Sequence, residues 1–307
     1  MDNKITKARL KNFFTYDFLK VLAIAAALSI FMVVLCNLFA VKPTGGQRLL
    51  ILYGDDIEVE EGGANLFVQP FMQDAEYKYS YEVLEAADKY LNKGEQTSQY
   101  MLKTWHDVGD DDIFICTDSL TNADRPDSSL YRYYVTQQFA QDLKVFVNNA
   151  LDYTKPFFDE NGNPNITAIK EHFDLTRGKD NRFRTKSQKE EGLIAETERL
   201  KSIYDNANIL KDVFEKHPEI LKYDEYDFGS FHKTGHFAIR LRALTGAQNR
   251  AIDDFKGKEL TEVNGNKVFV GEVYLMIGFH EEINGDNHFE TLTYLVTFIK
   301  KYSNFIG

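Results

Sequence analysis

Residues 21–41 read VLAIAAALSIFMVVLCNLFAV, a run of 21 residues without a charged side chain. As a helix with a rise of about 1.5 Å per residue, this run is about 31 Å long, close to the hydrocarbon thickness of a bilayer. The alternative is a helix in the core of a soluble domain, but such a helix rarely lacks charge on every face over this length. We therefore predict a transmembrane helix over residues 21–41.

The two flanks of this run differ in charge. Residues 1–20 contain five basic and two acidic side chains, whereas only Lys42 and then Arg48 follow closely after the run. Because basic residues are retained on the cytoplasmic side, we expect residues 1–20 to be a cytoplasmic tail and the rest of the chain to lie outside the cell membrane. The aromatic residues that fall at the expected membrane interface are Phe13, Phe14, Tyr16 and Phe18.

A cleaved signal peptide is an alternative for the same run. The run is longer than the usual apolar region of about 7–15 residues, and no small-x-small site closes it, so an uncleaved signal-anchor fits better. Cys36 suggests a lipoprotein, but Val34 and Leu35 are too bulky for a typical lipid-attachment motif. With Cys36 in the bilayer and Cys116 outside, we expect no disulfide between them.

The negative charge belongs to the part after the membrane segment. The chain has 36 basic and 47 acidic side chains, of which residues 1–41 hold five and two, so residues 42–307 carry a net charge of −14. An acidic domain without a basic stripe is a poor nucleic-acid binder, and it attracts cations. Two cysteines exclude a disulfide-rich scaffold and a four-thiolate zinc site.

Outward from the membrane segment, residues 42–48 form a linker rich in Gly and Pro. Residues 49–53 are then continuously apolar and stop at Gly54, which is typical of a strand buried on both faces. Residues 112–117 (DIFICT) form a second such run, and residues 81–91 between them have helical spacing. Strand, helix and strand in this order predict a right-handed crossover and a partly parallel sheet.

The rest of the chain predicts further helices and strands. We expect helices over residues 128–153, 166–173, 188–217 and 288–302, and strand regions over 237–243 (one face wet) and 268–279. A tight turn is expected at 263–266. The predicted fold class is α/β: a transmembrane helix, then an extracytoplasmic domain over residues 49–307. That domain has three layers, a mixed sheet between helices and a helical insertion at 154–222.

Polar side chains follow both predicted buried strands. Ligands of open α/β sheets bind at the carboxyl ends of parallel strands, so these side chains form the candidate ligand site, suited to a cation or an amine. The alternative is that they only cap the turns that follow the strands. The candidate residues are Asp55, Asp56, Thr117, Asp118 and Ser119.

A second candidate site is a zinc site formed by His232, His236 and His280. Exposed loop histidines are the alternative explanation. The string at Ser230–Gly235 (SFHKTG) contains S-x-x-K and K-T-G, but both share one lysine, so we interpret it as coincidence. No glycine-rich phosphate loop, G-x-S-x-G or H-E-x-x-H motif occurs. We predict no enzyme activity, no catalytic residue and no cofactor.

The N-terminal anchor, LLILYG, DIFICTDS and the ending EVYLMIGF followed by NHFETLTYLVTFIKKYS are together similar to membrane-tethered relatives of bacterial extracytoplasmic solute-binding proteins. In that family a strand and then a helix often end the chain. The resemblance implies a binding or accessory protein that works with an ABC transporter permease. This chain departs from the family in its membrane helix, which replaces a lipid anchor, and in its shorter length.

Two other functions remain open. The first is an envelope scaffold without a small ligand, which binds a protein partner through residues 154–222. The second is a metal-dependent hydrolase that uses Asp55, Asp56 and Asp118, or the three histidines named above. Under each of these functions the lipid bilayer is the partner of residues 21–41.

Overall fold

The computed structural model describes residues 6–7, 11, 13–39, 48–54, 57–59, 85–91, 95–109, 111–118, 129–176, 183–228, 231–246, 250–257, 260–263, 266–268, 272–279, 289 and 291–306. The chain forms two compact units, Met1–Lys42 and Pro43–Gly307.

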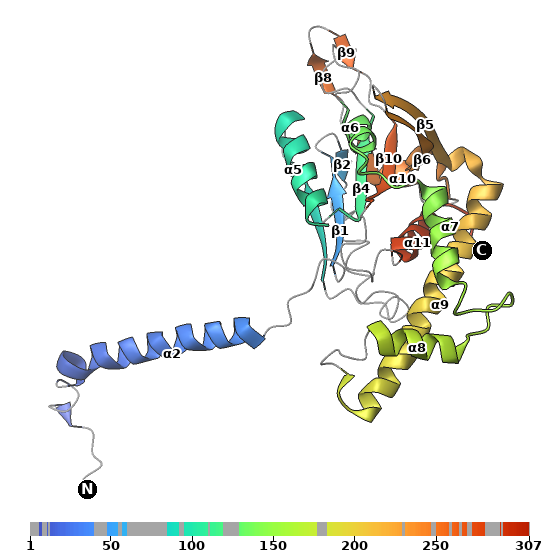
Figure 1. Ribbon diagram of the computed structural model, residues 1–307. Helices are drawn as coiled ribbons and strands as arrows, with labels where there is room; N and C mark the ends of the chain where they lie inside the picture. The colour runs from blue at the N-terminus through green and yellow to red at the C-terminus, as the bar shows by residue number, and fades with distance from the viewer. Residues whose placement is uncertain are drawn as a thin grey trace. The chain divides into compact units, whose positions relative to one another are not determined.

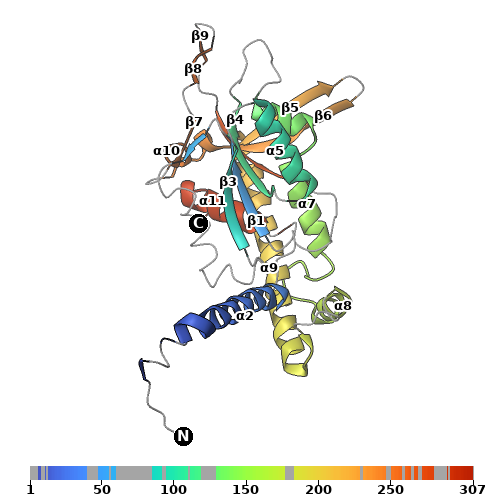
Figure 2. The same cartoon turned by 90° about the vertical axis from the view of Figure 1, so that its left-hand side faces the viewer.

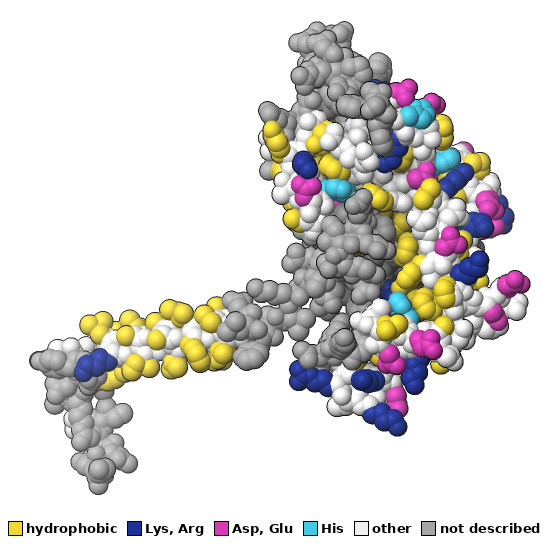
Figure 3. All heavy atoms as spheres, in the orientation of Figure 1, with side chains coloured by type: hydrophobic (Ala, Val, Ile, Leu, Met, Phe, Trp, Pro, Cys, Tyr) yellow, Lys and Arg dark blue, Asp and Glu magenta, His cyan; other side chains and the backbone are white. Residues whose placement is uncertain are grey.

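Most of the described residues of the first unit form one long helix. A π-helical turn, η1 (Phe13–Asp17), leads directly into α2 (Phe18–Phe39). Figure 3 shows hydrophobic side chains along the visible length of α2, and the apolar residues of its Phe18–Cys36 portion are not buried. Among the described residues, α2 is the helix that is long and apolar enough to cross a membrane. The prediction of an N-terminal apolar helix is therefore confirmed, with a start three residues before Val21.

The second unit is built around a six-stranded mixed sheet, with the strand order β3-β1-β4-β10-β6-β5 (Figure 1). β1 lies between β3 and β4 and is parallel to both, whereas β10 is antiparallel to β4 and β6. The prediction of a partly parallel sheet is confirmed. The strands are β1 (Arg48–Tyr53), β3 (Glu85–Tyr90), β4 (Ile113–Thr117), β5 (Leu221–Phe228), β6 (Phe231–Arg240) and β10 (Val273–Ile277).

Two small antiparallel sheets accompany the main one: β2 (Ile57–Val59) pairs with β7 (Phe255–Gly257), and β8 (Leu260–Val263) with β9 (Asn266–Val268). The β8–β9 hairpin lies at the predicted tight turn. The helices of this unit are α5 (Glu95–Asp107), α6 (Leu130–Thr136), α7 (Leu143–Thr154), α8 (Ile166–Thr176), α9 (Lys186–Lys216), α10 (Ala251–Asp254) and α11 (Thr291–Tyr302). Short 3₁₀ turns η4 (Pro218–Ile220) and η5 (Leu241–Ala243) flank β5 and β6.

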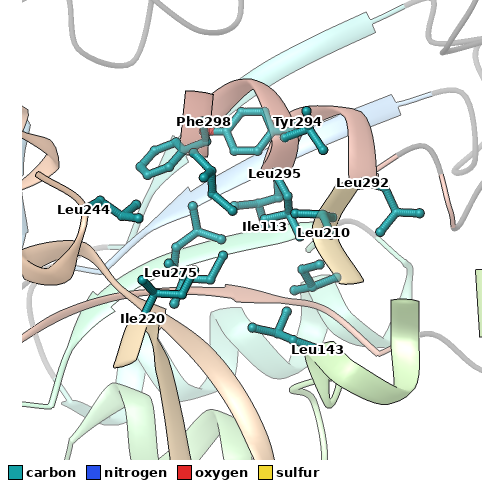
Figure 4. Close-up of a cluster of buried hydrophobic side chains, with 14 of the residues drawn as sticks. Ile113, Leu143, Leu210, Ile220, Leu244, Leu275, Leu292, Tyr294, Leu295 and Phe298 are labelled. Atoms are coloured by element: carbon teal, nitrogen blue, oxygen red, sulfur yellow. The ribbon is translucent and has the colours of Figure 1, made fainter. Parts of the chain in front are cut away.

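Each face of the sheet packs against a different set of helices. Alternate residues of β1, β4 and β10 enter one core with α7, α9 and α11, part of which is shown in Figure 4. The intervening residues enter a second core with α5 and α6. Figure 2 shows α5 and α11 on opposite sides of the sheet. Every residue of β4 and β10 is buried, as expected for strands that are covered on both faces.

The helix predicted over residues 81–91 is wrong. Residues Glu85–Tyr90 form strand β3, paired in parallel with β1 along its whole length, and residues 81–84 lie outside the described residues. Ala86, Ala87 and Lys89 favour helix locally, but pairing with the open edge of β1 outweighs that weak preference. The helix that covers this part of the sheet is α5, which follows β3.

The single helix predicted over residues 128–153 is also wrong, because the chain breaks between α6 and α7. Gln138 has a φ of 66°, which a helix cannot accommodate, and Asp142 caps the start of α7. The predicted cap of the first helix is correct, since Ser129 accepts a hydrogen bond from the Arg132 amide.

Two differences concern the predicted strand over residues 237–243. β6 ends at Arg240, and Phe237, Ala238 and Ile239 are all fully buried, so this part of the strand has no wet face. Its partner β5 was not predicted: it starts at Leu221, inside the range expected to be a helical insertion. The charged residues along β5 hide its strand pattern, as is common on an exposed edge strand.

The other long helices agree with the sequence. α9 begins at a capping box formed by Thr185 and Gln188, and it ends before Pro218. α8 and α11 lie where short amphipathic helices were expected, at residues 166–173 and 288–302.

Asp142 connects α7 to the sheet. One carboxylate oxygen accepts hydrogen bonds from the amides of Lys144 (2.9 Å) and Val145 (3.0 Å), and the other accepts one from the amide of His236 on β6 (3.0 Å). Gly235 makes this approach possible, because a Cβ at that position would lie 2.2 Å from Asp142 Oδ2. The glycine of the K-T-G string is therefore explained by packing.

We expect Gly235→Ala to lower the free energy of unfolding by about 1–3 kcal/mol, because the new methyl group displaces the Asp142 carboxylate. Asp142→Ala should cost about 1 kcal/mol through loss of the cap. The double variant should be more stable than the sum of the two single effects implies, since removing the carboxylate makes room for the methyl group. Urea unfolding of the full chain in detergent, followed by circular dichroism, tests this coupling, and strictly additive effects would contradict it.

Candidate functional site

The two buried strands named by the sequence are neighbours in the sheet. β1 and β4 run parallel, with Tyr53 opposite Ile115, and the Gly54 amide donates to the Ile115 carbonyl at 2.8 Å. Their carboxyl ends therefore lie at the same edge of the sheet. At this edge Thr117 is buried and Asp118 is half-buried. Asp55, Asp56 and Ser119 lie outside the described residues, so their part in this site remains a prediction.

Asp118 contacts side chains that come from distant parts of the chain. The Tyr274 hydroxyl donates to Asp118 Oδ2 at 3.1 Å and lies 3.3 Å from Glu272 Oε2. Glu272 in turn accepts a hydrogen bond from Arg240 Nε at 3.1 Å. This places two carboxylates on the hydroxyl of one buried tyrosine.

A second tyrosine extends the group. The ring of Tyr131, on α6, lies 4.7 Å from that of Tyr274, and its hydroxyl donates to Asp224 on β5. Lys222 Nζ lies 3.4 Å from the same Asp224 carboxylate. We call Asp118, Tyr131, Asp224, Glu272 and Tyr274 together the tyrosine–carboxylate cluster.

The electrostatics of this cluster keep both tyrosines protonated. Burial raises the pKa of Tyr131 and of Tyr274 far above the usual value, and the adjacent carboxylates, Asp224 and Asp118 respectively, raise it further. Each hydroxyl therefore remains a hydrogen-bond donor at any physiological pH. The group thus consists of two buried tyrosines and three carboxylates, of which Asp224 and Glu272 also contact the cations Lys222 and Arg240.

Of the five cluster residues, only Asp118 was a predicted site residue. The hydrogen bond to Asp118 joins positions 156 residues apart, and the one between Tyr131 and Asp224 spans 93 residues. The strand pattern of β10 was visible in the sequence, but its position beside β4 was not. No local motif could have found the two tyrosines.

The predicted zinc site is not assembled by the described residues. His232 and His236 lie on strand β6 rather than on a loop, opposite Asp227 and Tyr223 respectively. Each ring has its own partner: His232 contacts Asp227 at 2.5 Å, and His236 packs edge-on against Tyr223. His280 lies outside the described residues. In the part of the chain that the structure describes, no group of three or more His, Cys, Asp or Glu side chains could hold a metal ion.

The two histidines also differ in their pKa. The hydrogen bond from His232 to Asp227 raises the pKa of His232. Burial lowers the pKa of His236, and the positive charge of Lys144 lowers it further. The two rings thus have different surroundings as well as different partners.

A second polar network lies within the helical region. Arg199 is 2% exposed and Glu196 4% exposed, and they form a bidentate ion pair with distances of 2.9 and 2.7 Å. His172 on α8 lies 3.5 Å from Glu196, and Tyr153 on α7 contacts both His172 (3.3 Å) and Arg199 (3.4 Å). These contacts connect α7, α8 and α9. Nothing in the spacing of Glu196 and Arg199 distinguishes them from the exposed charges of α9.

A third network fixes the opposite end of β4. Asp111 accepts hydrogen bonds from Tyr134 on α6 at 2.6 Å and contacts His106 on α5 at 3.0 Å. The neighbouring Asp112 accepts one from the Leu50 amide at 2.7 Å. Because these contacts tie α5, α6 and β1 to the start of β4, we assign them a structural role.

The chain was also compared with known protein families, curated proteins and solved structures, and it matches none of them.

We expect Arg199→Met to lower the free energy of unfolding by about 3–5 kcal/mol, because it leaves the Glu196 carboxylate buried without its bidentate arginine. Glu196→Leu combined with Arg199→Met should recover most of this loss, since no charge then remains buried. The matched control is Lys201→Met, which breaks an exposed pair with Asp205 on the same helix and should cost less than about 1 kcal/mol. The measurement is urea unfolding of the unsubstituted protein and the three variants. If Arg199→Met lowers the free energy of unfolding no more than Lys201→Met does, the structural role of the buried ion pair is contradicted.

Proposed function

We propose that this chain is a single-pass membrane protein whose α/β domain lies outside the cell membrane and binds a small ligand, as an accessory protein of an ABC transporter permease. The single observation that carries the binding proposal is the position of the tyrosine–carboxylate cluster at the carboxyl end of β4. Open α/β sheets bind their ligands at this edge.

The membrane part of the proposal rests on α2 and its flanks. α2 has 22 residues, and Lys20 is the one charged residue within it. The excess of basic side chains in residues 1–20 favours a cytoplasmic N-terminus. Residues 43–307 form a compact unit with its own cores, which suits a domain tethered to the membrane through one helix. The two cores, one on each face of the sheet, favour the three-layer arrangement expected for this domain.

The chemistry of the cluster favours a cationic ligand that bears an amine. Carboxylates attract the positive charge of the amine, and the hydroxyls of Tyr131 and Tyr274 hold Asp224 and Asp118 in place. The net charge of −14 over residues 42–307 favours the approach of such a ligand. The hydroxyls of Tyr131 and Tyr274 stay protonated because burial raises the pKa of both. We therefore propose that the cluster binds a ligand and does not catalyse a reaction.

One observation favours the alternative, an envelope scaffold. The helical region has a small core of its own around Phe157, Phe158 and Ile169. Leu175 on α8 and Ile194 on α9 are exposed there. Such residues suit a protein partner, although single exposed aliphatic side chains are common.

The test is a thermal-shift screen of the full chain in detergent against amines, sugars, peptides and divalent cations at millimolar concentration. We expect an amine to stabilise the protein by about 2.7 kcal/mol where its concentration is a hundredfold above Kd. Tyr274→Phe and Asp118→Asn should each abolish the shift, because the first removes the hydroxyl that holds Asp118 in place and the second removes the Asp118 charge.

The control is Asp227→Asn on the β5–β6 hairpin, which removes an exposed charge outside the cluster and should leave the shift intact. A screen without any response, or a response that both cluster variants retain, would contradict the proposed site. The first of these outcomes would favour the scaffold alternative.

A further inference from the structure

The segment before α2 carries three exposed phenylalanines that lie against one another. Phe13, Phe14 and Phe18 are 39%, 59% and 40% exposed. Their ring centroids are 5.5, 6.5 and 5.6 Å apart, within the range of favourable aromatic pairs. We call these three residues the aromatic trio.

The π-helical turn explains why the three rings meet. In η1 the backbone hydrogen bonds join residues five apart, which places Phe18 over Phe13, whereas in an α-helix these two positions diverge. Phe14 and Phe18 are four residues apart and are also neighbours on one side. The Thr15 hydroxyl donates to the Lys11 carbonyl at 2.7 Å, which ties this turn to Lys11, two residues before its start.

Basic side chains flank the trio. Lys7, Lys11 and Lys20 are described and exposed. In the sequence, residues 1–20 hold five basic and two acidic side chains, although residues 42–307 are acidic. A cluster of exposed aromatic rings next to lysines, directly before an apolar helix, has the composition of a membrane-interface segment.

From this arrangement we propose that the aromatic trio and the exposed lysines Lys7, Lys11 and Lys20 form a lipid-recognition element, which binds anionic phospholipid headgroups of the leaflet on its side of the membrane. The aromatic trio enters the interface, where its rings leave water, and the three lysines contact the negatively charged headgroups. The element sets both the depth of α2 and the lipid neighbours of the protein. This inference rests on the proposed membrane anchoring, and it concerns a surface separate from the tyrosine–carboxylate cluster.

The experiment uses the full chain in vesicles and a single tryptophan reporter. Trp105 is the only tryptophan, so Phe14→Trp in a Trp105→Phe background places the sole fluorophore in the trio. The vesicles contain phosphatidylcholine and phosphatidylglycerol with a trace of dansyl-labelled lipid of either type. Energy transfer from the tryptophan should favour dansyl-phosphatidylglycerol, and this preference should decline at high salt.

Lys7→Gln, Lys11→Gln and Lys20→Gln together should remove that preference. Each lysine should account for a factor of up to about five in the preference for the anionic lipid. The matched control replaces Lys186, Lys189 and Lys216 of the second unit by Gln, which changes the net charge equally and should preserve the preference. Equal transfer to both lipids before substitution, or the same preference after the Lys7, Lys11 and Lys20 changes, would overturn the inference.

Alkaline extraction of the same vesicles separates this result from the anchoring on which it rests. A chain that is washed out by alkali is not anchored, and the proposed function then fails as well. A chain that stays in the vesicles but shows no lipid preference contradicts only the lipid-recognition element.

Discussion

Strand β4 is the constraint on which the second unit depends. Its five residues are buried on both faces, so their peptide groups need strand partners on both edges. β1 fulfils this need in parallel on one edge, and β10 in antiparallel on the other. The direction of the sheet therefore changes beside β4, and β10 begins at the carboxyl end of β4, where Val273 lies opposite Thr117. Asp118 contacts Tyr274 because of this pairing.

The polar networks of the domain follow from the same burial. The tyrosine hydroxyls and ionised side chains of these networks enter the interior together with partners, because an unpaired polar group there is costly. Tyr134 and Asp111 fix the start of β4, and Glu196 with Arg199 fixes the helical region. The tyrosine–carboxylate cluster differs from these two networks in its position at the carboxyl end of β4, the edge at which other open α/β sheets bind their ligands. That position, rather than its hydrogen bonding alone, makes it the candidate site.

Elements with a strong local pattern could be predicted, and elements that depend on distant partners could not. The apolar runs of β1 and β4 and the 3.6-residue period of α9 are unambiguous in the sequence. β3 has the composition of a helix and becomes a strand only because β1 offers a free edge. Similarly, Asp118 could be predicted as a candidate from its place after a buried strand, whereas Tyr131 and Tyr274 reach the cluster through tertiary packing. A single sequence does not reveal which strands are neighbours.

The proposed function requires α2 to cross a membrane, with the α/β domain outside the cell. A membrane-impermeant maleimide applied to intact cells tests this requirement directly, because it reacts only with exposed thiols outside. Labelling of the two native cysteines should be low, because Cys116 is buried and Cys36 lies in the bilayer if α2 crosses it. Lys186→Cys, at an exposed position on α9, should be labelled, whereas Lys7→Cys should be labelled only after the cells are lysed. Labelling of Lys7→Cys but not Lys186→Cys on intact cells would contradict the account.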